Sequence, residues 1–211
     1  MKQITIPKKV QEIGMGIVSN CTNLEKININ KENTQFIIDN SILYDKNKSR
    51  LIAYPIGKKE DKIDYLSTNL ERIEGYSFYY APYIETILIP ESVKYIGERA
   101  FGYSNLKRIY FKGDPPLECD NIFEGLEIDI YFPINNNKWD NQTCNFGSYS
   151  TSYIPYDYNS NDSAYLITIL VISCIVVIIA FIVIYLYCIK KKGIKSKNVD
   201  FSRADSLAEI Q

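Results

Sequence analysis

The residues best suited to binding chemistry recur at a regular spacing: Tyr65, Leu88, Tyr110 and Tyr131 lie 21 to 23 residues apart, with Arg108 beside Tyr110. Tyrosine offers a large contact area and a hydrogen-bonding tip, and it is enriched at binding surfaces. The sequence therefore predicts a contact surface if the fold aligns these residues. The pattern is equally compatible with tyrosines that serve only a sheet, because the chain holds 18 of them and strands favour aromatic residues.

Residue types that support catalysis are missing from the sequence. There is no histidine, the five cysteines form no CxxC pair, and no nucleophile elbow, phosphate-binding loop or dinucleotide fingerprint occurs. The formal net charge of -1 gives no basic field for nucleic acid. We therefore expect a protein that is not an enzyme, uses no cofactor or metal, and binds no nucleic acid.

The element that must position the contact residues is a repeat, best formed at residues 87–111. Ile87 and Ile89 alternate as in a short strand, Pro90 ends that run, and a second apolar set follows before the next alternating pair. Related units recur with a period of 21 to 23 residues, at positions 4–29, 66–87 and 122–133. Such a period predicts a leucine-rich-repeat solenoid of parallel strands with turn or short-helix returns, whose stacked units share one core.

The motifs of residues 87–111 resemble the BspA-like class of leucine-rich repeats, found on bacterial and protist cell surfaces. They are Ile-x-Ile-Pro, Val-x-x-Ile-Gly, Ala-Phe and Leu-x-x-Ile. The resemblance covers roughly residues 3–140, including a hairpin insert at about 33–59 and a closing unit at 111–116 and 130–139. The unit at 64–83 departs from it, lacking the Pro and the Ala-Phe pair, and the start shows no cap. The resemblance therefore indicates a short or N-terminally shortened member.

The strand register predicts which residues face outward. If Ile87 and Ile89 point into the core, Leu88 points out. The equivalent positions place Tyr65, Tyr110 and Tyr131 in one apolar and aromatic row with Leu88, because neighbouring strands lie about 4.8 Å apart. Arg108 flanks this row.

A change of composition after residue 134 predicts the end of the repeat ectodomain. Residues 135–162 are rich in Asn, Ser, Thr and Tyr, which predicts a polar stalk. Cys119 and Cys144 flank the closing unit and are compatible with a disulfide in an oxidising space, or with two free thiols. Four sequons make candidate glycosylation sites at Asn20, Asn47, Asn141 and Asn161.

Residues 163–189 predict a single transmembrane helix, because 27 successive positions carry no charge and about 20 apolar residues cross a bilayer. The cytoplasmic tail, 190–211, starts with a basic cluster expected to attract anionic inner-leaflet lipid. That cluster comprises Lys190, Lys191, Lys192, Lys195 and Lys197. By the positive-inside rule the repeats lie outside the plasma membrane. Cys188, at the boundary, is a candidate for palmitoylation or a free thiol.

These features predict a single-pass surface glycoprotein that presents leucine-rich repeats for adhesion or recognition. The expected ligand is a protein or glycan on host cells, matrix or microbes. The alternative is a receptor whose short tail mediates signalling or endocytosis. A structural coat component, without a saturable ligand, is a third possibility.

Overall fold

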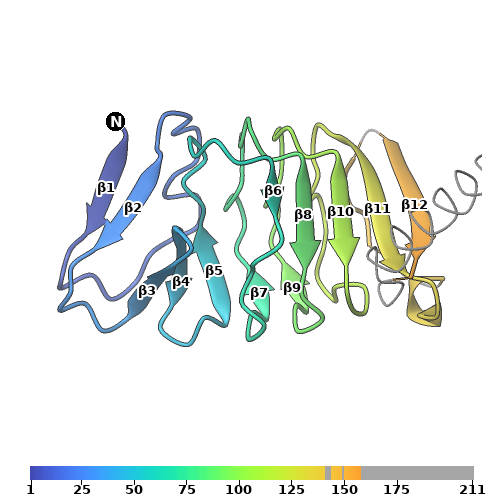
Figure 1. Ribbon diagram of the computed structural model, residues 1–211, viewed down its shortest axis with the longest axis horizontal. Helices are drawn as coiled ribbons and strands as arrows, with labels where there is room; N and C mark the ends of the chain where they lie inside the picture. Colours follow the sequence, from blue (N-terminus) through green and yellow to red (C-terminus); the bar gives the residue numbers. More distant parts are fainter. Residues whose placement is uncertain (141–143, 149, 158–211) are drawn as a thin grey trace, which may run out of the picture. The chain divides into compact units, whose positions relative to one another are not determined.

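The computed structural model describes residues 1–140, 144–148 and 150–157. Over this part the chain coils as a β-solenoid, as predicted, and successive strands stack side by side along its length (Figure 1). The first coil carries β1 (Gln3–Ile6), which pairs in parallel with β2 (Lys26–Ile29). Each turn contacts mainly its neighbours, which is the arrangement that a repeat with no core of its own requires.

Sheet I, which carries the candidate contact residues, has the order β12-β11-β10-β8-β6 and is parallel. Its strands are β6 (Lys62–Ile63), β8 (Thr86–Ile89), β10 (Arg108–Phe111), β11 (Glu127–Pro133) and β12 (Ser150–Tyr156). The predicted alternation is confirmed in β8, where Ile87 and Ile89 are buried and Leu88 is partly exposed.

Sheet II forms a second side and has the order β3-β4-β5-β7-β9. Its strands are β3 (Phe36–Asp39), β4 (Ile42–Asp45), β5 (Arg50–Ala53), β7 (Arg72–Ile73) and β9 (Tyr95–Ile96). The predicted hairpin insert is β4 and β5, which pair antiparallel; β3 adds a third antiparallel strand. β5 then continues in parallel with β7, so the insert is built into the solenoid wall.

A third side consists of turns that hydrogen-bond from one coil to the next. Phe78 N donates to Ala100 O over 2.8 Å, and Phe101 N donates to Ile122 O over 3.0 Å. Beneath these turns the rings of Tyr54, Phe78, Phe101, Phe123 and Phe146 form a column, with successive centroids 5.1, 5.1, 5.8 and 5.6 Å apart. This column explains the Phe of the Ala-Phe motif, since one aromatic ring per coil fills the core below the turn.

The glycine of the Val-x-x-Ile-Gly motif permits the close stacking of coils. A Cβ atom on Gly97 would lie 2.4 Å from the backbone nitrogen of Gly75 in the preceding coil. No side chain fits at that distance, so this close approach of the two backbones requires glycine at position 97.

The predicted polar stalk, residues 135–162, differs from the structure over most of its length. Residues 137–139 form a short 3-10 helix, η1 (Asn137–Trp139), whose Trp139 is buried against Phe111 and Phe132. β12 pairs with β11 through seven register positions, so the solenoid continues to Tyr156 rather than ending at 134. The serine-rich composition concealed this strand, although Tyr131 and Ile154 lie 23 residues apart, within the repeat period.

Candidate binding surface

The predicted outward row lies on sheet I. Leu88 pairs with Tyr110, Tyr110 with Tyr131, and Tyr131 with Ile154. The rings of Tyr110 and Tyr131 stack with centroids 4.2 Å apart and planes inclined by 13°. Burial, and then the electrostatic influence of the neighbouring Tyr131, raise the pKa of Tyr110, so the Tyr110 phenol stays neutral at physiological pH.

Tyr156 completes this surface and was not predicted. Its ring meets Tyr110 edge-on with centroids 5.5 Å apart, and its centroid lies 6.4 Å from that of Tyr131. The Tyr156 hydroxyl donates to the carbonyl oxygen of Phe111 over 3.1 Å, which fixes the ring against β10. We call the group Tyr110, Tyr131 and Tyr156 the tyrosine face.

A polar row runs beside the tyrosine face along the same sheet. It contains Thr86, Arg108, Asp129 and Ser152, each paired in register with the next. Arg108 is exposed as predicted, and its Nε donates to Thr86 Oγ1 over 3.3 Å. The surface thus offers fixed rings on one row and hydrogen-bonding and charged groups on the next.

The prediction that Tyr65 belongs to this row is wrong. Ile63 pairs with Ile87, so the residue level with Leu88 is Asp64. The coil between β6 and β8 is 24 residues long, one more than the predicted spacing, and a one-residue shift reverses the side on which a strand residue lies. Tyr65 instead packs partly buried against the core.

Tyr65 belongs to a polar cluster inside the wall. Its hydroxyl donates to Glu60 over 2.5 Å and accepts from Lys58 Nζ over 3.2 Å, and Tyr54 also donates to Glu60. Burial disfavours the Glu60 carboxylate, but hydrogen bonds from Tyr65 and Lys58 outweigh it and lower the pKa of Glu60. Every polar group of this cluster has a partner within the cluster, so we assign it to the fold.

A second tyrosine group, which the sequence did not predict, lies on the turn side. Tyr80 and Tyr103 stack with centroids 5.4 Å apart, and Tyr79 meets both edge-on. Tyr80 and Tyr103 have positive φ angles of 59° and 51°, and the equivalent position of the next coil is Gly125. The signal was again the period, since Tyr80 and Tyr103 lie 23 residues apart.

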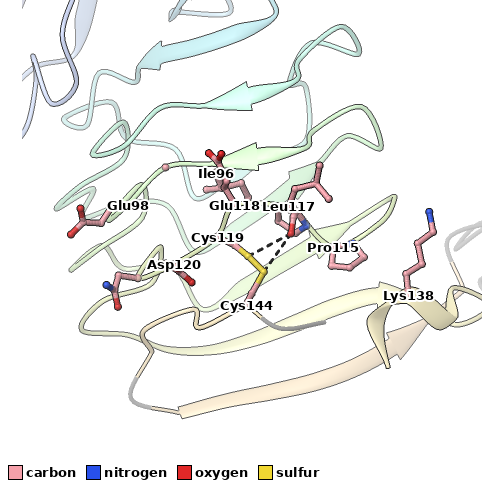
Figure 2. Close-up of a pocket in the computed structure, with 12 residues that line it drawn as sticks. Ile96, Glu98, Pro115, Leu117, Glu118, Cys119, Asp120, Lys138 and Cys144 are labelled. Carbon is pink, nitrogen blue, oxygen red and sulfur yellow. Dashed lines mark hydrogen bonds between the residues drawn. A yellow bond between two sulfur atoms is a disulfide. The ribbon is translucent and has the colours of Figure 1, made fainter. Parts of the chain in front are cut away.

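A pocket of about 760 Å³ opens beside the last coils (Figure 2). It is lined by Ile96, Gly97, Glu98, residues 115–121, Lys138 and Cys144. Cys119 and Cys144 form a disulfide there with Cα atoms 5.6 Å apart, and both sulfur atoms lie near the carbonyl oxygen of Pro116. The sequence had left open whether these cysteines pair.

Some of the remaining predicted sites lie within the residues that the structure describes, and others lie outside them. Asn20 and Asn47 are exposed, Asn47 at the tip of the β4–β5 hairpin. Asn141, Asn161, Cys188, the basic cluster and the apolar segment 163–189 lie outside the described residues. Within the part that is described, no helix has both the length and the apolar character to cross a membrane. In that same part, no group of three or more acidic or cysteine side chains is placed to hold a metal ion.

Comparison with known proteins agrees with this geometry, which is that of a leucine-rich-repeat solenoid. The family described as BspA type leucine rich repeat region matches residues 1–128 and 61–148, in six copies. The chain belongs to this family, which confirms the resemblance seen in the sequence. No curated protein matches the chain.

Three solved structures are similar to the chain. A leucine-rich repeat protein from Eubacterium ventriosum is 22% identical, with a TM-score of 0.47, over 73% of this chain and 49% of its own. A leucine rich cell surface protein from Faecalibacterium prausnitzii is 23% identical, with a TM-score of 0.48. The match covers 78% of this chain and 50% of that protein's chain. The pneumococcal vaccine antigen PcpA is 16% identical, with a TM-score of 0.32. The match covers 74% of this chain and 56% of that protein's chain. The chain thus spans about half the length of these proteins.

Proposed function

We propose that this chain is a cell-surface recognition or adhesion protein that binds a protein or glycan ligand through the tyrosine face of sheet I. The observation that carries the proposal is the fixed group of Tyr110, Tyr131 and Tyr156 on a partly exposed sheet surface. Rigid aromatic rings lose little entropy on binding, and the adjacent polar row supplies hydrogen-bonding groups. Membership of the BspA-type family supports a surface location.

We further propose that residues 163–189 anchor the chain in the plasma membrane, with the repeats outside and residues 190–211 in the cytoplasm. The support is the uncharged length of this segment and the lysine cluster that follows it. Membranes from cells that express the chain should retain it after alkaline carbonate washing. A variant lacking 163–189 should be released, and retention of that variant would contradict the anchor.

Binding is tested with the full-length protein in lipid nanodiscs, titrated onto host-cell monolayers and onto immobilised matrix proteins. We expect saturable binding that the double variant Tyr110→Ser, Tyr131→Ser weakens by about thirtyfold, because truncating a central aromatic anchor typically costs about 2 kcal/mol. The matched variant Tyr80→Ser, Tyr103→Ser alters the turn side only. If that variant alone loses binding, or if neither does, the tyrosine face is not the contact surface.

The receptor alternative rests on the tail rather than on the repeats. Deleting residues 190–211 should leave ligand binding unchanged on either view, because the tail lies outside the repeat region. Loss of ligand uptake or of signalling after that deletion would favour the receptor. Unchanged uptake would favour a passive adhesin.

A further inference from the structure

Tyr110 and Tyr131 have a geometry that goes beyond ligand contact. Their centroid separation of 4.2 Å is smaller than that of the other paired tyrosine rings in the described part of the chain, whose centroids lie 4.7 to 6.4 Å apart. The near-parallel planes bring equivalent atoms of the two rings close together.

The strand pairing and a neighbouring tyrosine ring hold Tyr110 and Tyr131 in place. β10 and β11 are adjacent in sheet I, and Tyr110 and Tyr131 are direct register partners (Figure 1). Tyr156 packs edge-on against Tyr110 and is itself tied to Phe111 O. Both rings of the pair are partly exposed, so an oxidant in solution reaches their edges.

We propose that Tyr110 and Tyr131 form an oxidative cross-linking site, at which a haem peroxidase and hydrogen peroxide join the two rings as dityrosine. Each phenol loses one electron and one proton to become a phenoxyl radical. The two radicals combine through a bond between their Cε carbons, ortho to the hydroxyls, and each ring returns its displaced Cε hydrogen to the phenol oxygen. One peroxide molecule takes up the two electrons and two protons and leaves as two water molecules.

The location of the pair gives the cross-link a structural consequence. In a solenoid each coil is held mainly by its neighbours, so the terminal coils separate most easily. The disulfide between Cys119 and Cys144 already joins coils at this end of the solenoid. A bond between Tyr110 and Tyr131 would join β10 to β11 on sheet I, under the same oxidising conditions that keep a disulfide formed.

The test treats the full-length protein in detergent micelles with peroxidase and hydrogen peroxide. We expect blue dityrosine fluorescence in the monomer fraction and a monomer mass lowered by two hydrogen atoms. Peptide mapping should join the peptide containing Tyr110 to the one containing Tyr131. The urea midpoint of the cross-linked protein should rise.

Conservative variants separate this site from general tyrosine oxidation. Tyr110→Phe and Tyr131→Phe keep the rings but remove the phenol, so each should abolish the intramolecular link; circular dichroism checks that they fold. Tyr80→Phe, on the other stacked pair, should leave it intact. Cross-links spread over other tyrosines, fluorescence that survives Tyr110→Phe, or no monomeric cross-link would each overturn the proposal. The test needs no ligand, so its outcome is independent of the binding experiment.

Discussion

The buried hydroxyl of Ser77 marks a position where the repeat motif is imperfect. Ser77 occupies the position that Ala100 holds one coil later, directly before the column residue Phe78. It is only 1% exposed, and its hydroxyl has no hydrogen-bond partner among the described residues. Burying an unsatisfied hydroxyl costs free energy that an alanine avoids.

Ser77→Ala should therefore raise the free energy of unfolding, by about 1 kcal/mol, as measured by urea denaturation. Ser92→Ala is the matched control, because the Ser92 hydroxyl donates to Leu70 O over 2.7 Å. Removing that bond should lower stability by about 1 kcal/mol. Equal effects of the two substitutions would show that the Ser77 hydroxyl is satisfied in solution.

Residue positions were predictable where strands repeat at a constant interval, and not where a coil changes length. Leu88, Tyr110 and Tyr131 share their expected row because β8, β10 and β11 follow a period of 22 and 21 residues. Tyr65 lies outside it because one additional residue reverses the side on which a side chain points. Sequence periodicity alone does not locate such an insertion, since the apolar pattern on each side of it is intact.

At the scale of elements, a disulfide lies next to the last strand of sheet II in the described part of the chain. Cys119 follows directly after Glu118, which bridges to Tyr95 at the edge of that sheet. The disulfide connects it to Cys144, 25 residues later. Cross-linking a loop of this size stabilises a fold by about 3 kcal/mol, mainly by restricting the unfolded chain.

The double variant Cys119→Ser, Cys144→Ser should lose about 3 kcal/mol of unfolding free energy. Reductant should destabilise the parent protein by a similar amount and leave the variant unchanged. Cys21→Ser serves as the control, because Cys21 is a free thiol and its removal keeps the reductant effect. A urea midpoint of the parent that does not respond to reductant would contradict this stabilising role.

Strands whose residues follow the repeat motifs were predictable from the sequence. A strand whose composition departs from those motifs was not. β8 and β10 lie at the two ends of the best-formed unit, residues 87–111, and their apolar alternation predicts the strands. β12 has the sequence STSYIPY, which is polar enough to indicate a stalk. It forms a strand because β11 offers a paired edge along seven positions, a tertiary effect that local composition does not encode.

Across the described chain, the hydrophobic interior divides into two clusters. The smaller one includes Ile6, Val18, Leu24, Ile27 and Phe36. The larger one extends along the later coils and contains all five rings of the aromatic column. β4 lies between them, since Leu43 packs into the smaller cluster while Ile42 and Tyr44 pack into the larger. The antiparallel insert therefore forms the boundary between two partly independent cores.

This division predicts that the first coils open without the rest of the solenoid. Leu24 is 1% exposed and packs within the smaller cluster. Leu24→Ala should cost about 2 to 5 kcal/mol locally, because it leaves a cavity among few neighbours. Hydrogen exchange, followed by mass spectrometry, should accelerate in residues 1–35 and stay unchanged in β8, β10 and β11.

Leu106→Ala is the reciprocal variant, because Leu106 is 2% exposed and belongs to the larger cluster. It should accelerate exchange in β8, β10 and β11. The smaller cluster includes residues of β4 and β5, and other residues of these strands belong to the larger cluster. Loosening the larger cluster should therefore also accelerate exchange in residues 1–35. Coupling is thus expected to be one-sided, with the smaller core depending on the larger one. If Leu24→Ala accelerated exchange equally in β10 and β11, the two clusters would unfold as a single cooperative unit, and the insert would not be a boundary.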